Sequence, residues 1–137
     1  MILLDTDALS ILLRPPVPTR LEELLHEVPP EAQFTSAINI GELVYGAHRG
    51  PHTQRHLDGL RTKVLPNVTV LPFDQEAALI YGRVRADLER KGRPIAEPDL
   101  CVAAITLAHR LTLVTGNVRH FERIPGLRVE DFRAARR

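Results

Sequence analysis

Two kinds of apolar pattern alternate along the chain. Short apolar segments predict buried strands, and longer segments in which apolar residues return every three or four positions predict amphipathic helices. The predicted strands are residues 1–5, 32–36, 68–73, 111–115 and 127–131. The predicted helices are residues 8–13, 19–28, 37–50, 52–65, 75–92 and 97–110, with a turn and half-helix over 116–121.

Residues suited to helix ends support these boundaries. Ser36 and Asp74 are predicted N-caps, because their side-chain oxygens can accept hydrogen bonds from the free N–H groups of the helices that follow. Thr6 or Asp7 is the predicted cap of the first helix. Gly50 is the predicted end of the helix that begins after Ser36.

The alternation predicts an α/β protein built in three layers. Strands that are apolar throughout are buried on both faces, which is typical of a parallel sheet with helices above and below it. The chain has 137 residues, a length that suits one domain and is too short for two of ordinary size. We therefore expect a single domain over residues 1–137.

Polar residues gather where the predicted strands end. Asp5 follows the first strand, and Glu42 lies on the helix after the second. Asp99 opens the helix before the fourth strand, and residues 115–117 end that strand. Because ligands bind outside the carboxyl ends of the strands in open parallel sheets, the sequence predicts an acidic cluster at that edge.

Helix capping is the alternative explanation for the aspartates. A carboxylate near a helix N-terminus gains roughly 0.3–1 kcal/mol from the helix dipole and the free N–H groups. Asp5, Asp7 and Asp99 can each be explained in this way. Glu42 cannot, because it lies in mid-helix beside an apolar stripe, where a core-facing carboxylate needs a cation. A solvated face remains an alternative for Glu42 alone.

Charge and cysteine content narrow the class of protein. The 18 basic and 17 acidic residues give a formal net charge of +1, so overall charge does not make the chain a generic binder of polyanions. Cys101 is the single cysteine, which excludes an internal disulfide. No basic segment precedes the short apolar start, and no apolar run reaches the roughly 18 residues of a membrane span. We expect a cytoplasmic protein that is not associated with a membrane.

Three segments together resemble a known family. They are "ILLDTDAL" (2–9), "TSAINIGELVYGA" (35–47) and "EPDLCVAAITLAHRLTLVTGNVRHFERIPGLRVEDF" (97–132), in this order and with one acid apiece at the family's positions. The chain resembles a PIN-domain ribonuclease, and within that group a VapC-type toxin of a bacterial or archaeal toxin–antitoxin pair. The resemblance covers nearly the whole chain, and it implies a three-layer α/β/α PIN-like domain with a central, mainly parallel sheet.

The resemblance also implies a site and its chemistry. Asp5, Glu42 and Asp99 match the acidic centre that binds Mg²⁺ or Mn²⁺, and Asn117 completes the implied catalytic set. The implied activity is that of an endoribonuclease, in which a metal-activated water attacks an RNA phosphodiester and no side-chain nucleophile is needed. Hard divalent cations do prefer such oxygen ligands.

Partners are implied as well. The resemblance predicts an RNA substrate, a homodimer, and a small antitoxin protein whose tail covers the active site. Such tails often present an arginine to the carboxylates, and a forked guanidinium is a good substitute for a metal ion in an acidic pocket.

The sequence departs from the family pattern at three positions. Asn117 stands where many relatives carry a fourth acid, and it adds no charge to hold a second metal ion, which argues against a two-metal mechanism. Asp7 stands where these toxins often have asparagine, and Pro98 where asparagine is common. Asp7 or Glu97 could supply part of the missing charge, although a solvated or capping role is the simpler explanation of either.

Two other functions are alternatives to the nuclease. In a haloacid-dehalogenase-type phosphatase, "DTD" after the first strand would supply an Asp nucleophile and a second Asp. Such a site also needs a suitably placed lysine and a later acidic pair, and the chain has only Lys63 and Lys91 and no Asp-Asp pair. The other alternative is a PIN-type module that binds partners without catalysis, which the near-complete acidic triad argues against.

A histidine stripe offers a further hypothesis. His48, His52 and His56 follow at four-residue steps, which on one continuous helix could hold a transition metal. Gly50-Pro51 interrupts that helix, so we expect the stripe to be solvated or to face substrate.

Cys101 and a group of arginines can be explained by burial and solvent exposure, without a catalytic or RNA-binding role. Cys101 is expected to be a small buried hydrophobe, because a thiol nucleophile would need a neighbouring base. Four arginines of the helix over 75–92 and the turn after it could line an RNA path, but an exposed helix face is the simpler explanation. They are Arg83, Arg85, Arg90 and Arg93.

Overall fold

The computed structural model describes residues 1–134, and five strands in this part of the chain form one sheet. The strands are β1 (Ile2–Leu4), β2 (Gln33–Ser36), β3 (Thr69–Leu71), β4 (Thr112–Thr115) and β5 (Arg128–Asp131). Their order across the sheet is β3-β2-β1-β4-β5, and every neighbouring pair is parallel. The five predicted strands are confirmed, each slightly shorter than predicted. Of the predicted domain over 1–137, residues 135–137 lie outside the described residues.

Seven α-helices connect and cover these strands within residues 1–134. They are α1 (Thr6–Leu13), α2 (Thr19–Glu27), α3 (Ala37–Arg49), α4 (Thr53–Gly59), α5 (Gln75–Arg90), α6 (Glu97–Ala108) and α7 (Val118–Phe121). Ser36 and Asp74 cap α3 and α5 as predicted, each accepting a hydrogen bond from a backbone N–H of its helix. No helix in the described part of the chain is long and apolar enough to cross a membrane.

Two predicted helix boundaries are wrong. The first helix begins at Thr6, so Asp5 occupies its N-cap position. The predicted helix over 52–65 leaves the α-conformation after Gly59 and continues as a π-helix (Leu60–Val64) and a 3₁₀ turn (Leu65–Asn67). Pro66 lies in this 3₁₀ turn, and because it has no N–H it cannot donate the hydrogen bond that would continue the helix.

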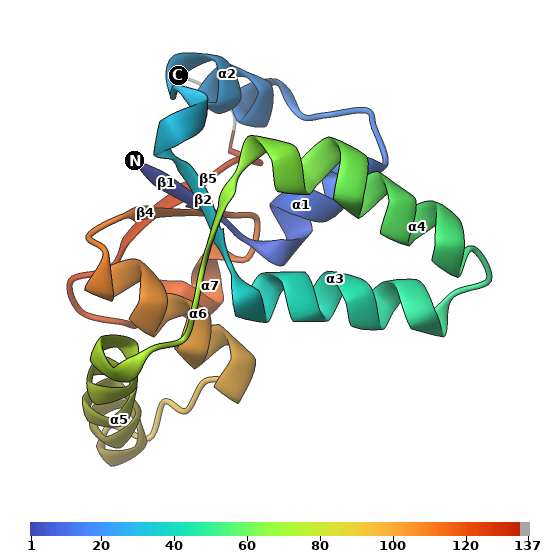
Figure 1. Ribbon diagram of the computed structural model, residues 1–137. Coiled ribbons are helices and arrows are strands. Elements are labelled where there is room, and N and C mark those ends of the chain that lie inside the picture. Colours follow the sequence, from blue (N-terminus) through green and yellow to red (C-terminus); the bar gives the residue numbers. More distant parts are fainter. Residues whose placement is uncertain (135–137) are drawn as a thin grey trace.

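Alternate residues of the central strands face opposite helical layers. Leu3 and Leu113 belong to the core beneath α5 and α6, whereas Ile2, Leu4 and Val114 belong to the core beneath α1 and α2. Figure 1 shows α5 and α6 on one side of the sheet and α1 and α4 on the other. The predicted three-layer α/β/α fold is therefore confirmed.

The order in which strands are added to the sheet reverses between β1 and β4, although all five strands run parallel. These strands lie side by side, with Leu4 paired to Val114, while β2 and β3 extend the sheet on one side and β5 on the other. In open parallel sheets the ligand crevice forms at such a point, outside the carboxyl ends of the strands. Asp5 follows β1 there, and Gly116 and Asn117 follow β4.

Candidate functional site

Asp5 is buried at the end of β1, with 7% of its surface exposed. Its Oδ1 accepts a hydrogen bond from Nδ2 of Asn39 at 2.9 Å, and its Oδ2 accepts one from Oγ1 of Thr115 at 2.8 Å. Its backbone N–H donates to the carbonyl of Val114 at 3.0 Å. Both carboxylate oxygens are therefore held in fixed positions by neutral donors.

No cation pairs with the Asp5 carboxylate among residues 1–134. The pKa of Asp5 is raised to about 6, chiefly by burial and further by the negative charges of Asp7 and Asp99, while the hydrogen bond from Thr115 acts in the opposite direction. The site therefore has an excess of negative charge around a buried carboxyl group.

Asp5 and Asp99 both lie at helix N-termini without making a capping hydrogen bond. Asp5 occupies the N-cap position of α1, but its side chain makes no capping hydrogen bond. Asp99 lies in the first turn of α6, whose N-terminus also has no side-chain cap. The capping alternative therefore keeps only its electrostatic part, the attraction of a carboxylate to the positive end of the helix dipole.

Asp7 connects the start of α1 to the turn after β4. Its Oδ1 accepts a hydrogen bond from the N–H of Ala8, and its Oδ2 accepts one from the N–H of Gly116, both at 2.8 Å. Asp7 is therefore not the N-cap of α1, because it lies inside the helix and its first bond joins it to the adjacent residue. The second holds the two strand ends of the site together.

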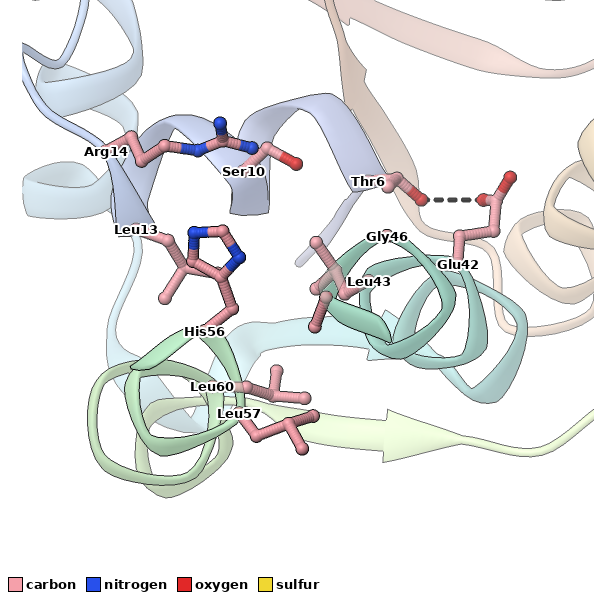
Figure 2. A pocket seen from close by; sticks show the side chains of 11 residues that line it. Thr6, Ser10, Leu13, Arg14, Glu42, Leu43, Gly46, His56, Leu57 and Leu60 are labelled. Atoms are coloured by element: carbon pink, nitrogen blue, oxygen red, sulfur yellow. Dashed lines mark hydrogen bonds between the residues drawn. The ribbon is translucent and has the colours of Figure 1, made fainter. Parts of the chain in front are cut away.

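Glu42 is half-buried on α3 and is oriented by a hydroxyl group. Oγ1 of Thr6 donates to its Oε1 at 2.7 Å, as Figure 2 shows, and the same Oγ1 accepts from Nδ2 of Asn39 at 2.9 Å. The buried amide of Asn39 therefore holds Asp5 and Thr6 at once, and Ser36 completes its partners by donating to its Oδ1. Glu42 is connected to Asp5 through this hydroxyl and this amide.

Asp99 and Asn117 meet at the ring of His120. Nδ1 of His120 lies 3.2 Å from Oδ2 of Asp99 and 2.9 Å from Nδ2 of Asn117. This nitrogen donates to Asp99 when it carries a proton and accepts from the Asn117 amide when it does not. The backbone N–H of Asn117 also donates to Oγ1 of Thr115 at 3.0 Å, which returns the network to Asp5.

One continuous series of contacts joins all four predicted site residues. In order, its members are Glu42, Thr6, Asn39, Asp5, Thr115, Asn117, His120 and Asp99. The predicted residues therefore converge on one edge of the sheet, as an acidic active site requires.

The comparison with known families decides which kind of acidic site this is. The PIN domain model matches residues 2–127. The chain belongs to the PIN-domain family. This membership argues against the phosphatase alternative.

Individual relatives place the chain within the PIN-domain family. The tRNA(fMet)-specific endonuclease VapC of Salmonella typhimurium is 39% identical over 97 residues, which are 71% of this chain and 73% of that protein. Toxin FitB of Neisseria gonorrhoeae is 33% identical over 126 residues, covering 88% of this chain and 91% of that protein. The crystal structure of DNA-bound VapBC from Salmonella typhimurium matches with a TM-score of 0.87 at 33% identity, covering 96% of this chain and 97% of that one. These matches support the predicted VapC-type PIN toxin.

Asn39 and His120 are the members of the PIN-domain site that the sequence interpretation missed. Asn39 precedes Glu42 by three residues on one helix, and His120 follows Asn117 by the same step. Residues three apart share a helix face, so each polar pair could have been recognised by its spacing.

Other residues considered from the sequence lie outside the network. Glu97 accepts a hydrogen bond from the hydroxyl of Tyr81 at 2.9 Å, so its carboxylate is engaged with α5. Cys101 is only half-buried, whereas a buried side chain was predicted, and partial burial raises the pKa of its thiol, which makes it a poor nucleophile.

The histidine stripe is divided between two helices. His48 lies near the end of α3, whereas His52 precedes α4 and His56 belongs to it. The break at Gly50-Pro51 is thus confirmed, and the three rings do not lie on one continuous helix.

The acidic centre fits a cation that keeps part of its water shell. Within residues 1–134, no three His, Cys, Asp or Glu side chains are placed so that they could together hold a metal ion. Asp5, Glu42 and Asp99 therefore do not form a closed cage of protein ligands. Their oxygen donors and the uncompensated charge at Asp5 suit Mg²⁺, which usually binds one or two carboxylates and retains several waters.

Proposed function

We propose that this chain is a metal-dependent endoribonuclease that acts as the toxin of a toxin–antitoxin pair. The proposal rests on the buried Asp5 carboxylate, which no cation neutralises among residues 1–134, although Asp7 and Asp99 place further negative charge beside it. An unpaired buried charge is costly, so this arrangement needs a reason, and binding a divalent cation supplies one. PIN-domain relatives that are ribonucleases support this function.

Some residues of the site are proposed metal ligands, and others hold those ligands or a water molecule in place. Asp5, Glu42 and Asp99 are the proposed ligands of Mg²⁺ or Mn²⁺, directly or through water. When bound, the cation would activate a water molecule and neutralise charge on the scissile phosphate. Asn39 fixes the carboxylate of Asp5, and Asn117 can orient a water molecule without adding charge.

The activity is tested with a labelled single-stranded RNA incubated with the purified protein and Mg²⁺ or Mn²⁺. We expect cuts that leave 5′-phosphate ends, loss of cleavage in EDTA, and loss of cleavage in Asp99→Asn. Because water is the nucleophile, an RNA with a 2′-deoxy residue at the scissile position should still be cut. Products ending in a 2′,3′-cyclic phosphate would overturn this mechanism, and failure to cut any RNA would favour the non-catalytic binding module.

An antitoxin and a second copy of the chain are the proposed protein partners. The structural relatives include toxin–antitoxin complexes from several bacteria, which supports the first proposal. The second proposal comes from the resemblance to VapC-type toxins alone. Light scattering at micromolar concentration should give the mass of a dimer, and a stable monomer would contradict the second proposal.

A further inference from the structure

A groove leaves the acidic centre and runs between α1, α3 and α4. Thr6 and Glu42 line one end of a first hollow, and Arg14 and His56 line the other end, as Figure 2 shows. A second hollow continues from Arg14 and His56 toward Lys63. Because the two hollows share Leu13, Arg14 and His56, they form one path, which we call the α1–α4 groove.

The charge of the α1–α4 groove changes sign along its length. Glu42 supplies the negative end, beside Asp5. At the far end, Arg14, Arg55 and Lys63 are cationic, and no described residue that lines the second hollow is acidic. Among residues 1–134, no carboxylate lies within ion-pair distance of these three side chains. Unpaired cations in a groove attract a polyanion and can bind its phosphates.

The dimensions and the lining of the groove suit a short piece of a single RNA strand. The chain rises about 12 Å along α1 from Thr6 to Arg14, which is comparable with roughly three stacked nucleotides at 3.4 Å each. The ring of His56 lies in the groove beside the apolar side chain of Leu13 on α1. Unpaired RNA bases stack on such planar rings, whereas a duplex would not expose its base faces.

We propose that the α1–α4 groove binds the RNA strand next to the scissile bond, with its phosphates on Arg14, Arg55 and Lys63. This inference rests on the proposed nuclease function and adds to it the path of the substrate and its single-stranded form. The acidic centre binds one phosphate through the cation, and the groove binds those that follow it.

The test compares two triple variants with equal loss of charge. The groove variant is Arg14→Gln/Arg55→Gln/Lys63→Gln, and the control is Arg83→Gln/Arg90→Gln/Arg93→Gln on and after α5, which lies apart from α4 in Figure 1. The control also tests the alternative RNA path along α5. Both are made in an Asp99→Asn background with Mg²⁺, so that the RNA stays intact, and circular dichroism melts verify folding.

Binding of a fluorescent unstructured RNA oligonucleotide is measured by anisotropy at several salt concentrations. The groove variant should bind roughly tenfold or more weakly, and its plot of log K against log salt should become shallower by about 2, as expected for three lost single-strand phosphate contacts. The control should keep the parent's slope. If the triple groove variant does not fold, Arg14→Gln alone should reduce the slope by about 0.7.

Each other outcome overturns a defined part of the proposal. Unchanged RNA affinity in the groove variant, or a loss in the α5 control instead, would overturn the α1–α4 groove as the RNA path. RNA affinity that is retained while a co-expressed acidic antitoxin no longer co-purifies would make the groove a protein site and overturn the proposal. Cleavage of RNA by the Asp99→Asn background would instead overturn the proposed active site.

Discussion

Replacing Asp5 by asparagine should stabilise the fold at pH 8 while it removes a metal ligand. The pKa of Asp5 is about 6 in the folded protein, against an ordinary value of 3.8. A carboxyl group whose pKa is raised by folding favours the folded state below its unfolded pKa, and this contribution is lost as the pH rises through 6. At pH 8 the charged form therefore costs the fold about 3 kcal/mol.

The hydrogen bonds of Asp5 reduce the expected gain. In Asp5→Asn the side-chain carbonyl can still accept the bond from Asn39. The new amide group faces the hydroxyl of Thr115, which can no longer donate and which already accepts from Asn117. This loss costs about 1 kcal/mol. We expect the variant to be more stable by about 2 kcal/mol at pH 8 and less stable by about 1 kcal/mol below pH 4, where only the hydrogen-bond loss remains.

Urea unfolding in EDTA between pH 4 and pH 8 measures this crossover directly. Asp74→Asn is the matched control, because Asp74 is an exposed cap of α5 and asparagine caps equally well. Mg²⁺ should stabilise the wild type and not Asp5→Asn. A variant that is destabilised equally at pH 4 and pH 8 would refute the argument that burial and neighbouring acids act on Asp5.

Three further substitutions test the surroundings of Asp5. Asn39→Asp places a second carboxylate against Asp5 and should lower the free energy of unfolding by about 2–4 kcal/mol at pH 8 and by less at pH 4, as urea unfolding would show. Glu42→Gln can keep the bond from its hydroxyl donor, so its melting temperature should change little while RNA cleavage falls roughly 10–100-fold. Asn117→Asp adds a fourth acid to the centre and should tighten Mn²⁺ binding roughly fivefold by isothermal titration.

The fold could be predicted because its signals are local. The apolar residues of β1 are adjacent in sequence, and α3 begins at a Ser36 side chain that bonds three residues ahead. The start of α1 could not be predicted in the same way, since Asp5, Thr6 and Asp7 are all suitable caps. The hydroxyl of Thr6 donates instead to Glu42, which is 36 residues away. Local sequence preferences cannot predict such a distant contact.

The acids of the site were predictable for a different reason. Asp5 follows a strand, and the carboxyl ends of parallel strands meet at one edge whatever the length of the connections. No such rule predicts the role of Asn39, because its hydrogen-bond partners Asp5 and Thr6 are 34 and 33 residues away in the sequence. The bond from Thr115 to Asp5 spans 110 residues. Only the pairing of β1 with its neighbours on both sides brings these partners together.

The three acids of the centre differ in how firmly the fold holds them. Asp5 is fixed at a strand end by donors from α3 and β4, so its position depends on the pairing of β1 with both neighbouring strands. Glu42 and Asp99 lie on two different helices, α3 and α6, and among the described residues each is held by a single side-chain contact. Because the least exposed acid is also the one held by the most hydrogen bonds, the charge that destabilises the metal-free protein is the one placed most accurately for a cation. Filling the centre should therefore bring Glu42 and Asp99 toward Asp5, and the stability gained on binding the ion should come chiefly from neutralising Asp5.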